Sequence, residues 1–234
     1  PLTYNGQVQT QGAAAASPAI LTNDLVAISG LASGKNVGVY GSNLAVSGAD
    51  VSNYNITLVN NNLTITPYII GSVAGGPVLT AAANDKVYNT TTSATGSLAM
   101  ANLFPGDSVA ANYASAAFAS AIVNTPSSPQ TVTFDGVTLS GAAANNYALA
   151  STSTTASANI TPAPITISGL VANNKVYTST TAATISGAPI VTGLLGSDTS
   201  TVTGSAVGTF TSPNVANNIT VTADLAGLTL GNNN

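Results

Sequence analysis

The chain has 234 residues, and only 4% of them are charged, compared with about a quarter in an ordinary globular domain. Seven aspartates and three lysines give a net charge of −4, so the chain lacks the cationic clusters that bind nucleic acid or an anionic membrane surface. Because histidine, cysteine and glutamate are absent, general acid–base catalysis, thiol chemistry and disulfides are excluded, and we expect no enzyme.

Residues 1–67 are predicted to form a first, short β module. It opens with a tyrosine in the turn-like "PLTYNGQ" and closes with "VSNYNITLVNNNLTITP". Alternating β-branched residues bounded by Asn and Gly predict short strands. Since proline has no N–H to donate to a sheet, Pro67 is expected to mark a strand end and the module boundary.

Residues 68–162 and 163–234 are predicted to be a second and a third module, because they repeat each other. "KVYNTTTSAT" from Lys86 returns as "KVYTSTTAAT" from Lys175, 89 positions later, and Asp135 and Asp224 keep the same offset. The second module closes with Ile-Thr-Pro, as the first does. We expect the first module to be truncated at its N-terminus and the third at its C-terminus.

The predicted fold class is all-β. Hydrophobic residues make up 44% of the chain and are spread along it, so we expect each module to fold, as a small sandwich or a β-grasp-like sheet. The linkers after each Ile-Thr-Pro are very short, which favours an elongated string of modules. No run of 18 apolar residues occurs, so direct membrane insertion is not expected.

In these motifs the chain resembles the YDG and MBG repeat modules of very large secreted Gram-negative adhesins, of the filamentous-haemagglutinin-like and biofilm-matrix kinds. Residues 1–66 resemble the MBG type and residues 68–234 the YDG type. The signature Tyr-Asp-Gly-Thr-Thr has changed to "YNTTT" from Tyr88 and "YTSTT" from Tyr177. The resemblance implies a secreted, extracellular protein of the bacterial cell surface, with roles in adhesion and biofilm formation.

Six residues recur as a repeat signature: Lys86, Tyr88, Asp135, Lys175, Tyr177 and Asp224. Three interpretations of the lysines stay open. They are solvated residues after a turn, or they form the ion pairs Lys86–Asp135 and Lys175–Asp224, or they form amide crosslinks to Asn or Asp. For Tyr88 and Tyr177, together with Tyr4, a role as core anchors is favoured over a carbohydrate-binding platform.

Asp107 and Asp198 are weak candidates for calcium ligands. They follow Gly or Ser in "FPGD" and "LGSD", where an aspartate ordinarily caps the N–H groups of a turn. Calcium needs several oxygen ligands close together, and the seven aspartates are dispersed. The turn role is favoured, and no other cofactor is expected.

The function predicted from the sequence is mechanical: a non-catalytic stalk of tandem modules in a long secreted adhesin. Two alternatives belong to other classes. The modules themselves bind polysaccharide in a biofilm matrix, or neighbouring adhesin chains associate into an extracellular filament, since edge charges that block strand pairing are scarce. The candidate partners are therefore flanking repeats of the same chain, polysaccharide and neighbouring chains.

Overall fold

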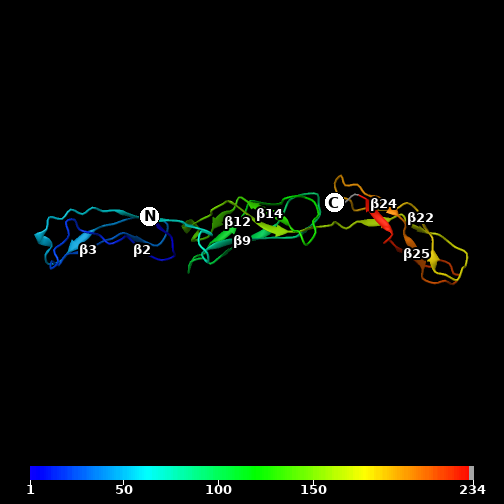
Figure 1. The fold of residues 1–234 in the computed structure, drawn as a ribbon, viewed down its shortest axis with the longest axis horizontal. Coiled ribbons are helices and arrows are strands. Elements are labelled where there is room, and N and C mark those ends of the chain that lie inside the picture. The colour runs from blue at the N-terminus through cyan, green and yellow to red at the C-terminus, as the bar shows by residue number, and fades with distance from the viewer. Residues whose placement is uncertain (232–234) are drawn as a thin grey trace. The chain divides into compact units, whose positions relative to one another are not determined.

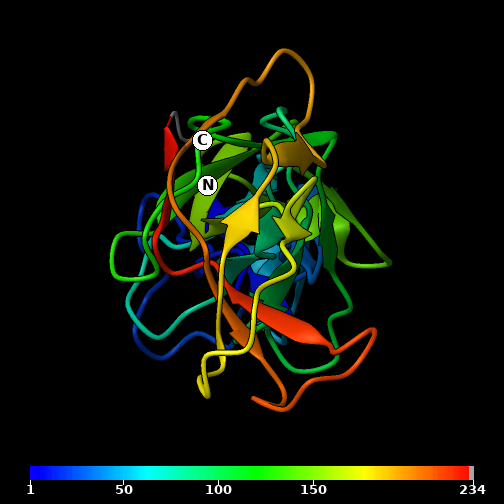
Figure 2. The same ribbon diagram turned by 90° about the vertical axis from the view of Figure 1, so that its right-hand side faces the viewer.

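The computed structural model describes residues 1–231, and its regular structure is almost entirely β (Figures 1 and 2). The all-β prediction is therefore confirmed. The strands are short and pair in many two- and three-stranded sheets. Within the described residues, the helical elements are two single 3₁₀ turns, η1 (Val51–Asn53) and η2 (Ala144–Asn146).

The chain forms two compact units. The first unit contains residues 1–83, 95–117 and 132–156, and the second contains residues 84–94, 118–131 and 157–234. Neither unit coincides with one predicted module. The module boundaries at Pro67 and Pro162 stay predictions.

The strands of the first unit pair in small sheets. In order across each sheet they are β1 (Leu2–Thr3), β7 (Asn62–Thr66) and β5 (Gly38–Gly41); β2 (Gln9–Thr10) and β4 (Ser33–Gly34); β3 (Ala27–Ser29) and β6 (Ala45–Ser47); β11 (Gly96–Ala101) and β9 (Val78–Ala83); β12 (Ala110–Asn112) and β15 (Thr138–Ser140); β16 (Tyr147–Ala148) and β8 (Tyr68–Ile69).

The strands of the second unit pair in the same manner. In order across each sheet they are β10 (Lys86–Val87) and β18 (Ile160–Thr161); β19 (Thr166–Ser168) and β23 (Ile190–Thr192); β20 (Val171–Ala172) and β22 (Ile185–Ser186); β21 (Ala182–Ala183), β25 (Val207–Phe210) and β26 (Val221–Asp224); β24 (Thr201–Gly204) and β27 (Leu228–Gly231). Three further strands, β13 (Ser115–Phe118), β14 (Gln130–Asp135) and β17 (Ser153–Ala158), form a sheet in that order.

Each Ile-Thr-Pro segment ends a strand, as predicted, and that strand pairs in parallel with the strand before a signature tyrosine. β7 pairs with β1, and β18 pairs with β10. The tyrosine that follows then continues the ladder by one bond. The Tyr4 N–H donates to the Thr66 carbonyl at 2.9 Å, and the Tyr88 N–H donates to the Thr161 carbonyl at 2.8 Å. This pairing holds each tyrosine beside the point where the chain leaves the module.

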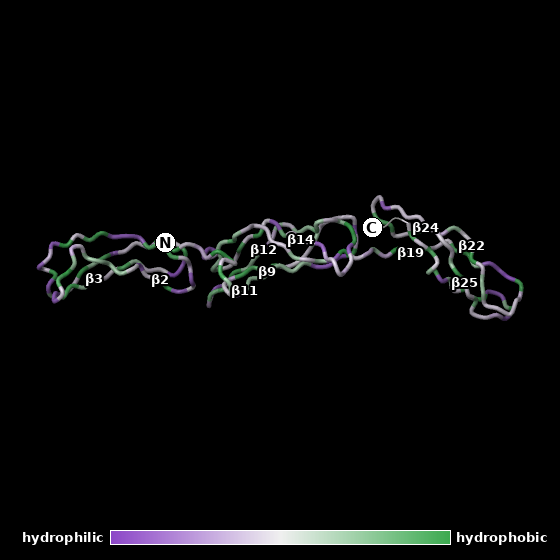
Figure 3. The backbone as a smooth tube through the Cα atoms, viewed as in Figure 1, coloured by the Kyte–Doolittle hydropathy of each residue, from purple (hydrophilic) through white to green (hydrophobic). Residues whose placement is uncertain are grey.

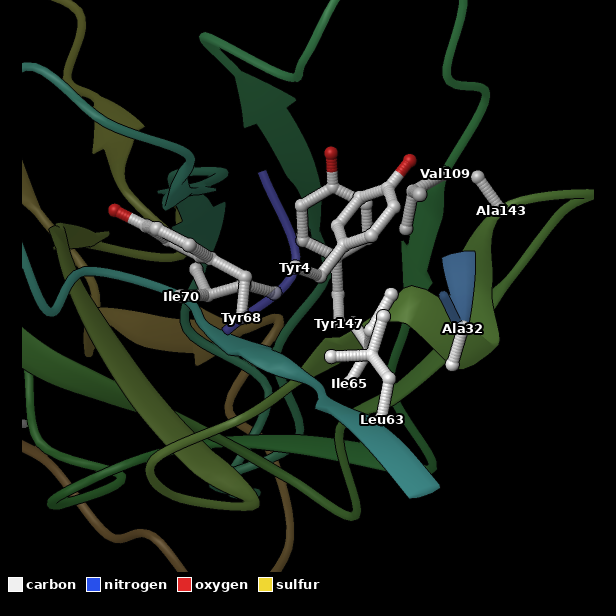
Figure 4. Packing of buried hydrophobic residues seen from close by; sticks show 9 residues of the cluster. All are labelled: Tyr4, Ala32, Leu63, Ile65, Tyr68, Ile70, Val109, Ala143 and Tyr147. Atoms are coloured by element: carbon white, nitrogen blue, oxygen red, sulfur yellow. The ribbon is translucent and has the colours of Figure 1, made fainter. Parts of the chain in front are cut away.

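Short alternating strands leave only narrow apolar faces, and Figure 3 shows hydrophobic residues in short pieces along the whole chain. The first unit contains a buried cluster of such residues (Figure 4). Its members are Tyr4, Ala32, Leu63, Ile65, Tyr68, Ile70, Val109, Ala143 and Tyr147. The cluster therefore combines side chains from the first predicted module with side chains from the second.

Candidate functional site

The carboxylate of Asp107 accepts hydrogen bonds from two tyrosines that are distant in sequence. The Tyr4 hydroxyl lies 2.9 and 2.8 Å from the two carboxylate oxygens, and the Tyr147 hydroxyl donates to Oδ2 at 2.6 Å. Figure 4 shows these two hydroxyl groups on the same side of the buried cluster. Because an ionised acceptor makes hydrogen bonds stronger than neutral pairs do, this group is a firm link. We call Tyr4, Asp107 and Tyr147 the tyrosine–aspartate clasp.

The turn before Asp107 shapes the clasp. The Asp107 N–H donates to the Phe104 carbonyl at 3.0 Å, and the Phe104 N–H donates to the Tyr147 hydroxyl at 3.2 Å. The rings of Tyr4 and Phe104 meet edge to face at 5.7 Å. Gly6 approaches Phe104 so closely that a Cβ there would lie 2.5 Å from the Phe104 Cβ, and its φ is +76°. Only glycine fits this approach without displacing the ring.

The same arrangement recurs within the first predicted module, around Asp24. The Tyr54 hydroxyl donates to Asp24 Oδ2 at 2.5 Å and accepts the Leu21 N–H at 3.3 Å. The Asp24 N–H donates to the Leu21 carbonyl at 3.1 Å, as Asp107 does to Phe104. Both tyrosines directly follow a 3₁₀ turn, η1 or η2. This pair was not predicted from the sequence, although "SNYNI" and "NNYAL" form a repeated signal in it.

Burial, and after it the hydrogen bond to Asp107, raise the pKa of Tyr4 to about 12. Burial is also the main cause that raises the pKa of Tyr147, and Asp107 is the second. The hydrogen bond to Asp24 raises the pKa of Tyr54. The tyrosines of these sites therefore stay protonated and act as hydrogen-bond donors to the carboxylates well above neutral pH.

Asp107 and Asp198 were predicted to be turn residues or calcium ligands. Both donate their N–H to the carbonyl three residues earlier, which is turn geometry. Within the described residues, 1–231, no three carboxylates come together in a group that could hold a metal ion. The two carboxylate oxygens of Asp107 lie instead against the tyrosine hydroxyls.

Lys86 holds the loop that follows its own tyrosine. Its Nζ donates to the Thr91 carbonyl at 2.5 Å, to the Ser93 carbonyl at 2.9 Å and to Asn89 Oδ1 at 3.0 Å. The ammonium also lies 5.4 Å from the centre of the Phe118 ring. Burial lowers the pKa of Lys86. One ammonium group thus satisfies several loop oxygens at once.

Lys175 repeats this arrangement in the next copy. Its Nζ donates to the Thr180 carbonyl at 2.7 Å and to the Ala182 carbonyl at 2.9 Å, and it lies 5.6 Å from the Phe210 ring centre. The acceptors are equivalent to those of Lys86. The lysines therefore recur because the module needs a donor that closes this loop. We call it the lysine-held loop.

The ion pairs proposed for these lysines are not what the structure shows, because both ammonium groups donate to neutral oxygens. Asp224 instead accepts the Ala226 N–H at 2.9 Å as a turn cap. Asp135 is exposed at the end of β14, directly before Gly136, whose φ is +66°. The physical reason is that several carbonyls in reach satisfy an ammonium without the cost of desolvating a carboxylate.

Of the two ammonium groups, that of Lys86 has a side-chain amide among its hydrogen-bond partners, whereas that of Lys175 donates to Thr180 and Ala182. Asn89 lies beside Lys86, while the equivalent position near Lys175 is Thr178, which has no amide group. A crosslink at Lys86 stays a prediction. The loss of one ammonia in the intact mass would reveal it.

The lysine-held loop has an unusual backbone at the third residue of the tyrosine signature. Thr90 has a φ of +67° and Ser179 a φ of +59°, matching Gly6 in the first module. Glycine is the residue that adopts this conformation without strain. The change from Gly to Thr or Ser in the second and third copies therefore leaves strain in these loops.

The three tyrosines predicted to be core anchors differ in burial. Tyr4 and Tyr88 are buried, at 1% and 7% exposure, which agrees with that role. Tyr177 is 59% exposed, so the prediction is wrong there. Lys175 and Val176 form no strand in the structure, whereas Lys86 and Val87 pair with β18. A platform of all three tyrosines cannot form, because two of them face the interior.

Small all-β sheets, repeated turns and side chains that join sequence-distant strands define this chain as a tandem-repeat β protein. Its sequence matches the model of the YDG domain twice, over residues 77–156 and 161–234, and the chain belongs to that family. No curated protein and no solved structure matched it. None of the described residues forms a helix long and apolar enough to cross a membrane.

Proposed function

We propose that this chain is a non-catalytic structural segment of a secreted cell-surface adhesin, serving as a stalk in cell adhesion and biofilm formation. The observation that carries the proposal is the tyrosine–aspartate clasp. It links Tyr4 of the first predicted module to Asp107 and Tyr147 of the second, over a shared buried cluster. A stalk needs modules that do not separate under load, and buried links of this kind supply that resistance.

The membership in the YDG domain family supports the same function, because its two matches are consecutive copies of one module. A chain of repeated modules becomes longer when modules are added, because each module brings its own hydrogen-bonded turns and needs no new type of contact. The weakly charged, cysteine-free composition suits a chain that crosses membranes unfolded and folds outside.

Single-molecule force spectroscopy of the whole chain, held at both termini, tests this proposal. Asp107→Asn keeps the shape of the side chain but removes its charge, so the hydrogen bonds to both tyrosines weaken by about 1 kcal/mol each. We expect the first unit to open at a lower force. Asp135→Asn is the matched control, since Asp135 is exposed. Equal opening forces for the wild type and both variants would show that the clasp does not resist the applied force.

Polysaccharide binding is a second candidate function, and the exposed Tyr177 is the observation that favours it. An exposed aromatic ring provides an apolar face on which a sugar ring can stack. On a glycan array, saturable binding that disappears in Tyr177→Ala would support this role. Binding that Tyr177→Ala leaves unchanged would assign it to another surface.

A further inference from the structure

The sequence contains a single Asn-Gly pair, Asn5-Gly6, among its many asparagines. In such a pair the backbone nitrogen of the glycine can attack the side-chain amide carbon, because glycine has no side chain that blocks the approach. The new N–Cγ bond forms as the amide nitrogen leaves as ammonia, which takes the proton that the glycine nitrogen gives up. Water then opens the cyclic imide to aspartate or isoaspartate. Asparagine is a thermolabile residue for this reason, and Asn5 is its most reactive instance in this sequence.

The structure gives the two reacting groups different surroundings. Asn5 is exposed, and its Oδ1 accepts the Gln7 N–H at 3.0 Å. Gly6, which supplies the attacking nitrogen, is buried, and a Cβ on it would lie 2.5 Å from the Phe104 Cβ. Water therefore reaches the amide, while the attacking nitrogen belongs to a residue that is packed against Phe104.

Tyr4 fixes the chain on the other side of Asn5. Its N–H donates to the Thr66 carbonyl at 2.9 Å, and its hydroxyl lies 2.9 and 2.8 Å from the two carboxylate oxygens of Asp107. The peptide group between Asn5 and Gly6 must rotate for the nitrogen to reach Cγ, and both ends of this segment are held. The reaction therefore proceeds from a locally opened state, and its rate follows the population of that state.

The second copy of the signature supplies an internal comparison. Asn89 corresponds to Asn5, because it is also exposed and its Oδ1 accepts the N–H of the residue two positions later, Thr91, at 3.2 Å. Asn89 is followed by Thr90, whose branched side chain hinders the attack. In the third copy the equivalent position is Thr178, which has no amide. The reactive pair is thus confined to the first copy of the turn.

We propose that Asn5 is a site of spontaneous deamidation, and that the tyrosine–aspartate clasp sets the rate at which it reacts. A chain whose clasp stays closed keeps the amide, and a chain whose clasp opens acquires a carboxylate at this position. Isoaspartate also adds one carbon to the main chain, and Gly6 has no room to shift against Phe104, so the closure does not re-form unchanged. The modification therefore records the opening of the link between the first two predicted modules. The proposal rests on the clasp and not on the stalk function, so the two can fail separately.

Incubation of the full chain in mildly alkaline buffer, with and without concentrated urea, tests the proposal. A lysine-specific protease then releases residues 1–35 and 87–175 from the unfolded chain, and mass spectrometry measures the conversion of Asn5 and of Asn89 from amide to acid. We expect Asn5 to react at least about tenfold more slowly in the folded chain than in urea, and Asn89 to lag behind Asn5 in urea. Equal rates for Asn5 with and without urea, or equal rates for both asparagines in urea, would overturn the proposal.

Variants of the clasp test its control of the rate. Asp107→Asn removes the charge and Tyr147→Phe removes one hydroxyl, so both weaken the clasp and keep the shape of the side chain. We expect Asn5 to react about tenfold faster in folded Asp107→Asn than in the wild type, and at an intermediate rate in Tyr147→Phe.

Asp135→Ser is the matched control, because Asp135 is exposed and serine avoids a second Asn-Gly pair before Gly136. Asn5 should react in this variant as it does in the wild type. Circular dichroism checks that the three variants are folded, and Tyr147→Phe decides the question if Asp107→Asn does not fold. A wild-type rate in the folded clasp variants would overturn the proposal.

Discussion

At the scale of single residues, the same few side chains solve the same local problems in each copy. An aspartate at the end of a turn accepts a hydrogen bond from a tyrosine hydroxyl, at Asp24 and at Asp107. The ammonium group of a lysine donates hydrogen bonds to the carbonyls of the loop that follows it, at Lys86 and at Lys175. Asp107 and Lys86 are partly withdrawn from water, and each has several hydrogen-bond partners, which offsets its desolvation.

The strain at Thr90 leads to a first prediction. Thr90→Gly is expected to raise the free energy of unfolding by up to about 1 kcal/mol, because relief of the left-handed conformation exceeds the added chain entropy. Urea unfolding of the whole chain measures this. In the same loop, Thr92 has no positive φ, so Thr92→Gly is expected to destabilise the protein instead. A destabilised Thr90→Gly variant would show that the threonine contacts outweigh the strain.

A second prediction concerns alkaline pH. In the unfolded chain Tyr4 loses its proton near its ordinary pKa of 10.0, while in the folded protein it keeps the proton up to about 12. Its contribution to stability is therefore complete below pH 10 and is lost as the pH rises toward 12. Urea unfolding from about pH 9 to about pH 11.5 should show falling stability, with a shallower fall in Tyr4→Phe. Identical slopes would contradict the role of burial and Asp107.

At the scale of elements, many antiparallel strand pairs join segments that are near in sequence, whereas the parallel pairs join segments that are far apart. β1 with β7 and β10 with β18 join segments more than 60 residues apart, so the strand before the tyrosine signature and the strand at the end of the module meet in one ladder. The lysine-held loop begins directly at this closure in the second copy. In the third copy the loop persists without a paired strand, and Val176 is 84% exposed.

This difference between copies leads to a third prediction. Lys86→Met should lower the free energy of unfolding by about 1–2 kcal/mol, because Lys86 is half-buried and the Thr91 and Ser93 carbonyls lose a charged donor. Lys175→Met should have a smaller effect, since Lys175 is exposed and water replaces the ammonium. Lys35→Met, at an exposed lysine outside these loops, is the control. Thermal unfolding of the three variants checks the order, and an effect of Lys175→Met as large as that of Lys86→Met would refute it.

At the scale of the whole molecule, stability is distributed over many small sheets rather than held by one large core. Fully buried large side chains are few, and most strands have one face in water. Backbone ladders, turn caps and the clasp therefore carry much of the stability. Such a protein depends on each contact between successive segments, as repeat proteins do.

A fourth prediction concerns the whole chain. Neither the addition of calcium nor its removal by a chelator should change the thermal stability of the protein. The clasp uses the carboxylate of Asp107 for tyrosine hydroxyls, and within residues 1–231 the carboxylates do not gather in groups of three. The melting temperature with excess calcium should equal that with a chelator. A rise of several degrees in calcium would demonstrate a site that binds the folded state.

The sequence by itself determined the fold class, the repeat and the role of Ile-Thr-Pro as a strand end, because period-2 alternation, turn residues and proline act over a few residues. It also showed that Lys86 and Lys175 recur, but their hydrogen-bond acceptors depend on the conformation of the loop that follows each lysine. The partners of Asp107 were decided only by the tertiary structure, since Tyr4 and Tyr147 reach it from 103 and 40 residues away. The exposure of Tyr177 was decided in the same way, because burial depends on how the rest of the chain packs around a side chain.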